Sequence, residues 1–404
     1  GRVKGEAASD FLQRNKEEHN MLSDGLKYQD SRMATCEEMK QDLAPFALHD
    51  ATAKSKGGPV LLRDGDTVYT DPSDSHSLIV GDTGSMKTLR FVLPLIYSCA
   101  AADESMVIVD PKGELARKSE SFLSAKGYKT VIINMRDPQR SPDTWNPMGV
   151  IERAYKSGEE GQQKAVLQLN DMLNDIFFRR VDTKDPYWNE SAGQLALGIC
   201  LLLLALGEKL NMQNLLKWRY EKLADGTLDK CFRNLPTDGE IYQNLAGYLG
   251  MTAENTKSCI RSTFDQLVRV FKSAPALTEM LNDTSFDIER IGEAKAAVFV
   301  VIPDEKTTFH FLATLFISQC YTTLLETAER HGGSLPRRTN IILEEFCNLP
   351  ALGDIVPMIT AARSRNIRLH MVIQSYGQLV EKYGENVSRA ILDNCGNMIY
   401  LHTR

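Results

Sequence analysis

The stretch "SLIVGDTGSMKT" (77–88) places a short apolar segment directly before a glycine-rich loop. The loop follows the phosphate-binding pattern G-x-x-x-x-G-K-[ST] at every position but one, because Met86 stands where the second glycine belongs. The residues before Gly81 have the character of a strand and those from Lys87 the character of a helix, which is the context that the motif requires. Three interpretations are open: an ATP-binding motor, a motor that has lost its nucleotide site, and a chance match.

In the functional interpretation the loop cradles phosphate with successive backbone N–H groups and the amino end of a helix. Lys87 would reach the β and γ oxygens, and Thr88 would bind Mg²⁺. Glycine at position 86 would leave room for close approach of the β-phosphate, whereas a flexible methionine must turn away or block it. The structural alternative is a glycine-rich turn. The candidate nucleotide-binding residues are Gly81, Asp82, Thr83, Gly84, Ser85, Met86, Lys87 and Thr88.

Around this loop, short apolar strands alternate with helices, which indicates parallel pairing with right-handed crossovers. Strand character appears in segments 77–81, 105–110, 129–135, 296–303, 339–345, 367–375 and 397–403. Between about 150 and 290 it disappears, and apolar residues recur at helical spacing. We therefore predict an α/β fold with a mainly parallel central sheet and an inserted all-α domain. The nucleotide-binding domain would comprise 57–150 and 291–404, and the inserted domain 151–290.

The N-terminal part is more polar. Residues 1–56 are predicted as a helical or extended segment, in which Thr35 followed by Glu38 marks the start of a helix. Residues 57–76 have the pattern of a hairpin, with turns at Asp64-Gly65 and Pro72.

Composition limits the class of protein. At 404 residues, with 43% hydrophobic and 25% charged residues, the chain has room for two or three globular domains. Its longest apolar run, 197–206, is too short to span a bilayer and suits a buried helix. Eight cysteines stand singly, without zinc spacing, which is typical of reduced thiols in a cytosolic protein. The net charge of −6 argues mildly against a protein whose surface is coated with nucleic acid, but it allows a locally basic channel.

A second candidate motif is "NIILEEFCNLP" (340–350), an apolar strand that ends in two acids. In P-loop ATPases such a strand ends in an acid that holds the Mg²⁺ shell, followed by a glutamate that polarises the attacking water. Glu344 and Glu345 occupy these positions, although the usual pair is Asp-Glu. Two solvated acids at a strand end are the structural alternative.

Two weaker signals follow. Gln374 ends the next strand, where it could sense the γ-phosphate or simply form a polar rim. Arg363 and Arg365 end a helix, where the helix dipole stabilises positive charge, but Arg363 could also be an arginine finger. No G-x-S-x-G elbow is present, so an α/β-hydrolase would have no nucleophile, and the phosphate loop does not match the dinucleotide-binding pattern G-x-G-x-x-G. Isolated histidines are read as structural: His76, His310, His370 and His402.

The order of these motifs resembles that of the TraG-like type IV coupling proteins, in a Gram-positive-like variant. These ATPases feed DNA and proteins into conjugation and type IV secretion channels. The resemblance covers most of the chain, and its motifs together are highly specific. They are "SRMATCEEM" (31–39), "HSLIVGDTGSMKT" (76–88), "VIVDPKGEL" (107–115), "WNPM" (145–148), "DPYWNESAGQLALGICLLLL" (185–204) and the whole of 343–384.

The resemblance implies a RecA-like P-loop NTPase domain with an all-α insertion, and a homo-hexameric ring around a DNA pore. It implies ATP and Mg²⁺ as ligands, with Glu344 as the metal acid and Glu345 as the catalytic carboxylate. Gln374 would be the γ-phosphate sensor and Arg363 a finger supplied in trans. Asp110 and Lys112 lie at a strand end beside the site, without an assigned role.

Expected partners are relaxase-bound single-stranded DNA, substrate proteins and channel components, at the cytoplasmic face of the bacterial cell membrane. The family's membrane helices do not precede this sequence, so we expect a soluble fragment, monomeric on its own. One alternative is a weakly hydrolysing or inactive platform that recruits substrate proteins, motivated by Met86 and Glu344. Another is an FtsK-like or HerA-like DNA pump, against which "DPKGE" and "NESAGQLAL" speak. Every version that hydrolyses ATP requires the helix at Lys87 to face the acids that close the 341–345 strand.

Overall fold

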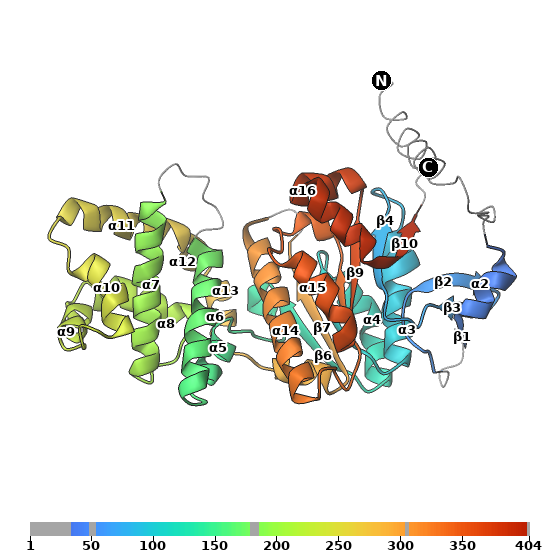
Figure 1. Cartoon of the computed structure of the whole chain (residues 1–404), viewed down its shortest axis with the longest axis horizontal. Coiled ribbons are helices and arrows are strands. Elements are labelled where there is room, and N and C mark those ends of the chain that lie inside the picture. Colours follow the sequence, from blue (N-terminus) through green and yellow to red (C-terminus); the bar gives the residue numbers. More distant parts are fainter. Residues whose placement is uncertain (1–33, 48–53, 178–185, 304–306, 402–404) are drawn as a thin grey trace, which may run out of the picture.

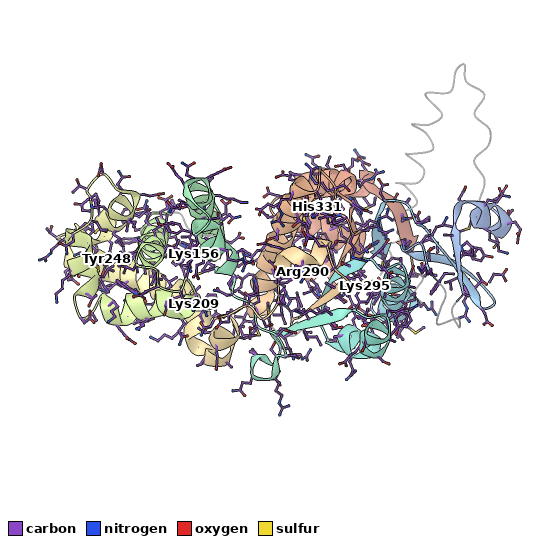
Figure 2. All side chains as sticks on the ribbon, turned by 90° about the horizontal axis from the view of Figure 1, so that it is seen from below. Lys156, Lys209, Tyr248, Arg290, Lys295 and His331 are labelled. Carbon is purple, nitrogen blue, oxygen red and sulfur yellow. The ribbon has the colours of Figure 1, made fainter. Side chains whose placement is uncertain are left out.

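The computed structural model describes residues 34–47, 54–177, 186–303 and 307–401. Residues 1–33 and 48–53 of the predicted N-terminal segment, and His402, therefore lie outside the described residues. Figure 1 shows three parts: a small sheet near the N-terminal end, an α/β domain in the middle and a helical domain at the other end. Figure 2, turned by 90°, shows the helical domain and the small sheet again at opposite ends.

The α/β domain is built on a seven-stranded sheet in the order β10-β4-β9-β8-β5-β7-β6. All six neighbouring pairs are parallel, so the predicted fold class is confirmed. In chain order the strands are β4 (His76–Val80), β5 (Ser105–Asp110), β6 (Lys129–Asn134), β7 (Ala296–Val301), β8 (Thr339–Leu343), β9 (Ile367–Ile373) and β10 (Cys395–Tyr400).

Strands buried on both faces explain the continuous apolar runs in the sequence. Met106 and Ile108 of β5 pack with α3 (Leu93–Ala101) and α4 (Glu114–Ala125) on one face. Val107 and Val109 belong to the core on the opposite face. That core also contains residues from α14 (His310–Arg330), α15 (Ile355–Ala362) and α16 (Tyr376–Asp393).

The described residues between 149 and 280 form the helical domain. Its helices are α5 (Gly149–Tyr155), α6 (Glu159–Phe177), α7 (Tyr187–Ala205), α8 (Met212–Lys217), α9 (Thr227–Arg233), α10 (Glu240–Leu249), α11 (Glu254–Leu267), α12 (Arg269–Ser273) and α13 (Pro275–Met280). Among the described helices, α7 alone is long and apolar enough to cross a membrane, but 72% of its apolar window is buried inside the protein. At Gly198 a β-carbon would lie 2.6 Å from the Leu245 side chain, so glycine permits the close crossing of α7 and α10.

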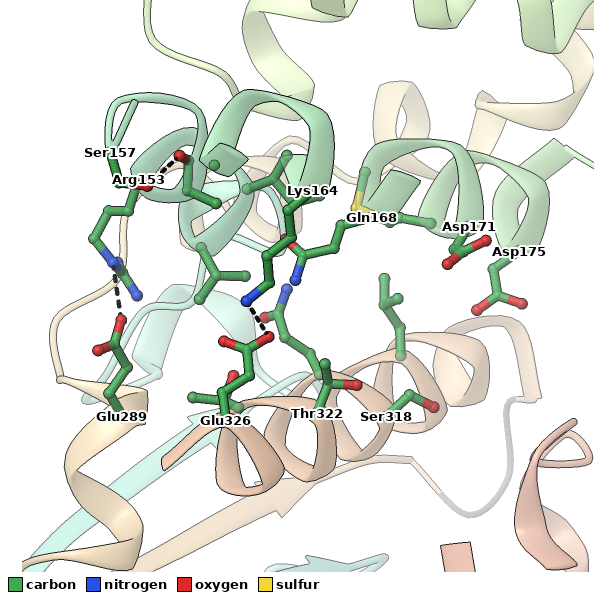
Figure 3. A pocket seen from close by; sticks show the side chains of 18 of the residues that line it. Arg153, Ser157, Lys164, Gln168, Asp171, Asp175, Glu289, Ser318, Thr322 and Glu326 are labelled. Carbon is green, nitrogen blue, oxygen red and sulfur yellow. Dashed lines mark hydrogen bonds and ion pairs between the residues drawn. The ribbon is translucent and has the colours of Figure 1, made fainter. Parts of the chain in front are cut away.

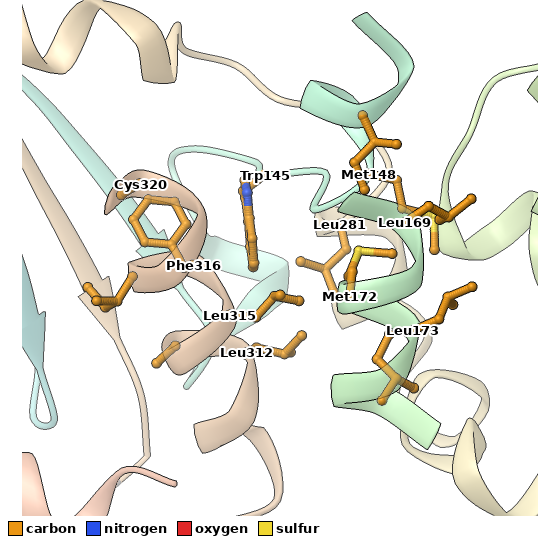
Figure 4. Close-up of a cluster of buried hydrophobic side chains, with 14 of the residues drawn as sticks. Trp145, Met148, Leu169, Met172, Leu173, Leu281, Leu312, Leu315, Phe316 and Cys320 are labelled. Atoms are coloured by element: carbon orange, nitrogen blue, oxygen red, sulfur yellow. The ribbon is translucent and has the colours of Figure 1, made fainter. Parts of the chain in front are cut away.

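One continuous apolar core runs from the sheet into the helical domain, and Trp145 lies where the two meet (Figure 4). Its ring packs edge-on against Phe316 of α14, with 5.0 Å between centroids. Its Nε1 donates to Oε1 of Gln319 at 2.8 Å, and Nε2 of Gln319 donates to the Pro147 carbonyl at 2.7 Å. The "WNPM" segment therefore joins the two domains through packing and hydrogen bonds.

The small sheet has the antiparallel order β1-β3-β2. The predicted hairpin corresponds to β2 (Val60–Asp64) and β3 (Thr67–Thr70), whereas β1 (Ala44–Ala47) was not predicted. Helix α2 (Cys36–Asp42) begins with the predicted capping box between Thr35 and Glu38.

A buried polar network lies at the amino edge of the large sheet, and no sequence motif predicted it. The side chains of Arg368 and Glu104 are 1% and 8% exposed and form an ion pair. Nε of Arg368 donates to Oδ1 of Asn340 at 2.9 Å, and Nδ2 of Asn340 donates to Oε2 of Glu104 at 2.9 Å. Nη1 of Arg368 also donates to the Ser73 carbonyl at 3.1 Å, which ties the loop after β3 to the sheet.

The described histidines take part in hydrogen bonds, and the cysteines form no disulfides. All eight cysteines are free, and five of them are buried. Each described histidine of the predicted structural set is held by hydrogen bonds: His76 to Ile359 and Leu369, His310 to Asn348 and Pro303, and His370 to Ser77 and Asn340.

Candidate nucleotide-binding site

The carboxyl ends of four neighbouring strands meet at one edge of the sheet. Val80 of β4 is level with Ile373 of β9, and Leu343 of β8 is level with Val109 of β5. The phosphate loop, Gln374, the Glu344-Glu345 pair and Asp110 directly follow these residues. Ligands of open parallel sheets bind at this kind of edge.

The loop after β4 turns sharply and then enters a helix. The amide of Ser85 donates to the Asp82 carbonyl at 3.2 Å. The helix opens with a π-helical turn, Thr88–Val92, that continues directly into α3. A β-carbon at Gly81 would lie 2.6 Å from the Ser85 hydroxyl, so steric crowding explains why glycine occupies this position.

Met86 has a left-handed backbone, with φ of 60°. A bulky residue is strained there, at a cost of about 1–2 kcal/mol, whereas glycine adopts this conformation freely. The side chain is 48% exposed, so it lies at the surface of the loop. The motif glycine is therefore missing at a position where the backbone conformation itself favours glycine. This strain is separate from the space that glycine would leave for phosphate.

Lys87 is buried and lies across the loop. Its ammonium donates to the carbonyls of Gly81 at 2.5 Å and Asp82 at 3.1 Å. Ser85 is 4% exposed, and its hydroxyl has no hydrogen-bond partner among the described residues. Buried hydroxyl groups are normally paired. An unpaired hydroxyl beside a buried lysine and the start of a helix fits a phosphate group.

Thr88 and Glu344 meet across the site. The Thr88 hydroxyl donates to Oε1 of Glu344, so the amino end of the helix and the end of β8 face each other. Burial raises the pKa of Glu344 to about 7, and the charges of Asp110 and Glu345 act in the same direction, against the Thr88 hydrogen bond. A hydroxyl and a carboxylate are ligands suited to Mg²⁺, and its charge would favour the ionised carboxylate.

Glu345 is held through one carboxylate oxygen. Oε2 accepts a hydrogen bond from Nε2 of Gln374 at 3.0 Å and another from Nδ2 of Asn348 at 3.2 Å. Its backbone is left-handed, with φ of 55°. Such strain tends to cluster at functional sites. The structure therefore brings Glu345 and Gln374 together, and it adds Asn348, which the sequence motifs did not predict.

Asp110 is fully buried beside Glu344. Burial raises its pKa, while backbone N–H groups at the start of α4 lower it, among them that of Ala116, which donates to Oδ2 at 3.0 Å. Its other oxygen, Oδ1, has no hydrogen-bond partner in the described part of the chain. Lys112, by contrast, is exposed.

Arg363 lies at the opposite edge of the sheet, just before β9. The seven residues of β9 span about 23 Å. The Arg363 guanidinium pairs with Asp74 at 3.0 Å, and Nη1 of Arg365 donates to the Ala361 carbonyl at 3.1 Å. Within one chain, therefore, Arg363 is not part of this site.

A well-formed cavity lies away from this site. It has a volume of about 400 Å³ and lies between α5–α6 and α14, far along the chain from the phosphate loop (Figure 3). Lys164 and Glu326 bridge it at 2.7 Å, and Arg153 lies 3.7 Å from Glu289. These ion pairs link the helical domain to the α/β domain and touch none of the predicted site residues.

Comparison with known proteins gives consistent results. The family model for type IV secretory system conjugative DNA transfer matches residues 23–404. The chain is 22% identical over 349 residues to the conjugal transfer protein TraG of Rhizobium radiobacter, covering 84% of this chain and 51% of that protein. The TraG of Agrobacterium fabrum is also 22% identical, with 84% and 50% covered. The chain thus spans about half the length of the curated relatives it matches.

Solved structures show the same fold. The plasmid coupling protein TrwB in complex with the ATP analogue ADPNP has a TM-score of 0.60 at 18% identity, covering 93% of this chain and 80% of that chain. TrwB in complex with ADP and Mg²⁺ has a TM-score of 0.60 at 19% identity, with 91% and 76% covered. VirB4 of Thermoanaerobacter pseudethanolicus has a TM-score of 0.53 at 15% identity, with 86% and 85% covered. The α/β domain therefore has the RecA-like fold of these proteins, as predicted.

Proposed function

Because the chain belongs to the family of type IV secretory system conjugative DNA transfer proteins, we propose that it is a coupling ATPase. It binds ATP with Mg²⁺ and uses hydrolysis to drive DNA or protein substrates into a secretion channel. The observation that carries this proposal is the contact between the Thr88 hydroxyl and the Glu344 carboxylate behind a phosphate-type loop. The solved TrwB complexes with ADPNP and with ADP and Mg²⁺ support the choice of ligands.

Each residue at the site has a proposed task. Loop amides would donate hydrogen bonds to phosphate, and the Lys87 ammonium, which donates to two loop carbonyls in this structure, would neutralise phosphate charge. Thr88 and Glu344 hold Mg²⁺, which supplies the electrostatic stabilisation of phosphoryl transfer. Glu345 orients the attacking water. Gln374 fixes the Glu345 carboxylate through their 3.0 Å hydrogen bond, and we propose that it responds to the γ-phosphate.

The position of Arg363 bears on assembly. Because it lies at the far edge of its own sheet, it could act on phosphate only in a neighbouring subunit. We propose a homo-hexamer in which each Arg363 breaks its exposed pair with Asp74 and reaches the next site. Such a ring would enclose relaxase-bound single-stranded DNA with contacts that depend on salt and not on sequence. Membrane association at the cytoplasmic face and contacts with channel components belong to the same proposal.

A second candidate function is a recruitment platform with little or no hydrolysis, which binds substrate proteins through the helical domain. The left-handed Met86 in place of glycine favours it. An FtsK-like or HerA-like pump for chromosomal DNA has less support, because the matching family is one of conjugative transfer.

Calorimetric titration with ADP and Mg²⁺ separates these functions. We expect the wild-type chain to bind, Lys87→Ala to lose binding, and Lys156→Ala to bind normally, because Lys156 is an exposed lysine of the helical domain. A wild-type chain that does not bind, together with a Met86→Gly variant that does, would support the platform. ATPase activity that is insensitive to Lys87→Ala would reject the coupling ATPase.

A further inference from the structure

The candidate metal acid has a second carboxylate beside it. Strands β5 and β8 pair in parallel with Val109 level with Leu343. The next residues, Asp110 and Glu344, are therefore neighbours across the sheet, about 4.8 Å apart at the backbone. Their side chains are 0% and 7% exposed.

Both carboxylates point to the face on which the phosphate-loop helix lies. Side chains alternate along a strand, so Asp110 shares the side of Ile108, and Glu344 shares the side of Ile342. Ile108 and Ile342 pack in the core together with residues of α3, the continuation of the helix that opens at Thr88. The contact between Thr88 and Glu344 confirms this direction for Glu344.

Helix capping gives a hydrogen-bond donor to one of the two carboxylate oxygens of Asp110. Oδ2 accepts from the Ala116 amide at 3.0 Å and so fixes the orientation of the side chain against the start of α4. Oδ1 is buried without a hydrogen-bond partner in the described residues. A buried carboxylate oxygen without a donor is costly, so a capping role alone leaves Oδ1 unexplained.

We propose that Asp110 is a second metal-positioning acid, whose Oδ1 accepts a hydrogen bond from a water in the shell of the Mg²⁺ held by Thr88 and Glu344. This inference rests on the proposed nucleotide-dependent function. Mg²⁺ retains several waters when bound through one or two carboxylates, and these waters are hydrogen-bond donors. The Oδ2 hydrogen bond pre-orients the acid, as outer partners of metal sites generally do.

The test uses Asp110→Asn, which retains an oxygen for the Ala116 amide and removes the charge. Calorimetry would measure ADP affinity at a series of Mg²⁺ concentrations, from which the Mg²⁺ affinity of the complex follows. We expect that affinity to fall about 10–100-fold, while ADP affinity without Mg²⁺ and the thermal unfolding midpoint stay the same. Asp238→Asn, at an exposed acid of the helical domain, is the matched control and should change nothing.

An unchanged Mg²⁺ dependence in Asp110→Asn would overturn the inference and leave Asp110 as a helix cap, with the proposed function intact. A wild-type chain that binds no ADP, with or without Mg²⁺, would overturn the proposed function and this inference with it. If Asp110→Asn does not fold, Asp110→Ser takes its place, because serine also caps helices. If neither neutral variant folds, the carboxylate serves folding itself and the inference fails.

Discussion

Replacing Met86 tests whether the phosphate loop is strained. A left-handed backbone costs a residue with a β-carbon about 1–2 kcal/mol, whereas glycine loses roughly 0.5–1 kcal/mol more conformational freedom on folding. Removing the β-carbon should therefore stabilise the fold by a net of about 0.5–1 kcal/mol. Burying a methionine side chain completely stabilises a fold by ~1.5–3 kcal/mol. Because Met86 is 48% exposed, removing its side chain should lose about half of that stabilisation.

These terms predict an order of stability. Met86→Ala loses the side-chain contacts and retains the strain, so it should be less stable than wild type by about 1 kcal/mol. Met86→Gly relieves the strain and should lie within about 0.5 kcal/mol of wild type, above the alanine variant.

Urea unfolding of the three proteins under identical conditions would measure this order. Leu167 supplies the control, because it is an exposed apolar residue with ordinary helical backbone in α6. There the order should reverse, with Leu167→Gly less stable than Leu167→Ala by about 1 kcal/mol. A Met86→Ala variant as stable as Met86→Gly would refute the argument, because the β-carbon would then carry no strain.

Three further predictions concern the interior, the junction and the site. Arg368→Met removes the nearer of two cationic partners of the buried Glu104, leaving Arg338 at 3.6 Å, and should lower the free energy of unfolding by up to about 3–5 kcal/mol. The double variant with Glu104→Leu should recover much of this loss in denaturant titration. Trp145→Ala should lower the free energy of unfolding by about 3–5 kcal/mol. It should also split the calorimetric unfolding transition in two, because the Trp145 ring joins the cores of the two domains. A single transition at the wild-type temperature would contradict that role. Glu345→Gln should reduce ATP turnover about 10²–10⁴-fold with ADP affinity retained, whereas equal turnover would remove Glu345 from catalysis.

Much of the fold could be read locally. Strands such as β5 and β7 contain continuous apolar runs, and helices such as α7 can be recognised by their length and composition. Parallel pairing also explains why the motif residues meet. Parallel strands bring their carboxyl ends to one edge of the sheet, and each motif follows a carboxyl end. This is why Thr88, Glu344, Glu345 and Gln374 come together as expected. Their chemical roles stay predictions.

The remaining features depend on contacts between distant segments. Asn348 joins the site because a turn after β8 brings it back to Glu345. The short strand β1 exists because β3 offers it an edge, and four residues carry too little pattern to show this. The ion pair of Glu104 and Arg368 links positions 264 apart in the chain, and no local rule connects them.

The sequence alone determined the α/β class and the helical segment, because both rest on periodicity, and the family, because its motifs follow one another in order along the chain. It also predicted the phosphate loop. The tertiary structure decided that Met86 is left-handed, that Arg363 lies at the far edge and that Asp110 is buried with one oxygen unpaired. Backbone handedness, the edge at which a side chain lies and unsatisfied burial are properties of assembled neighbours. A residue type restricts them, and only the folded chain sets their values.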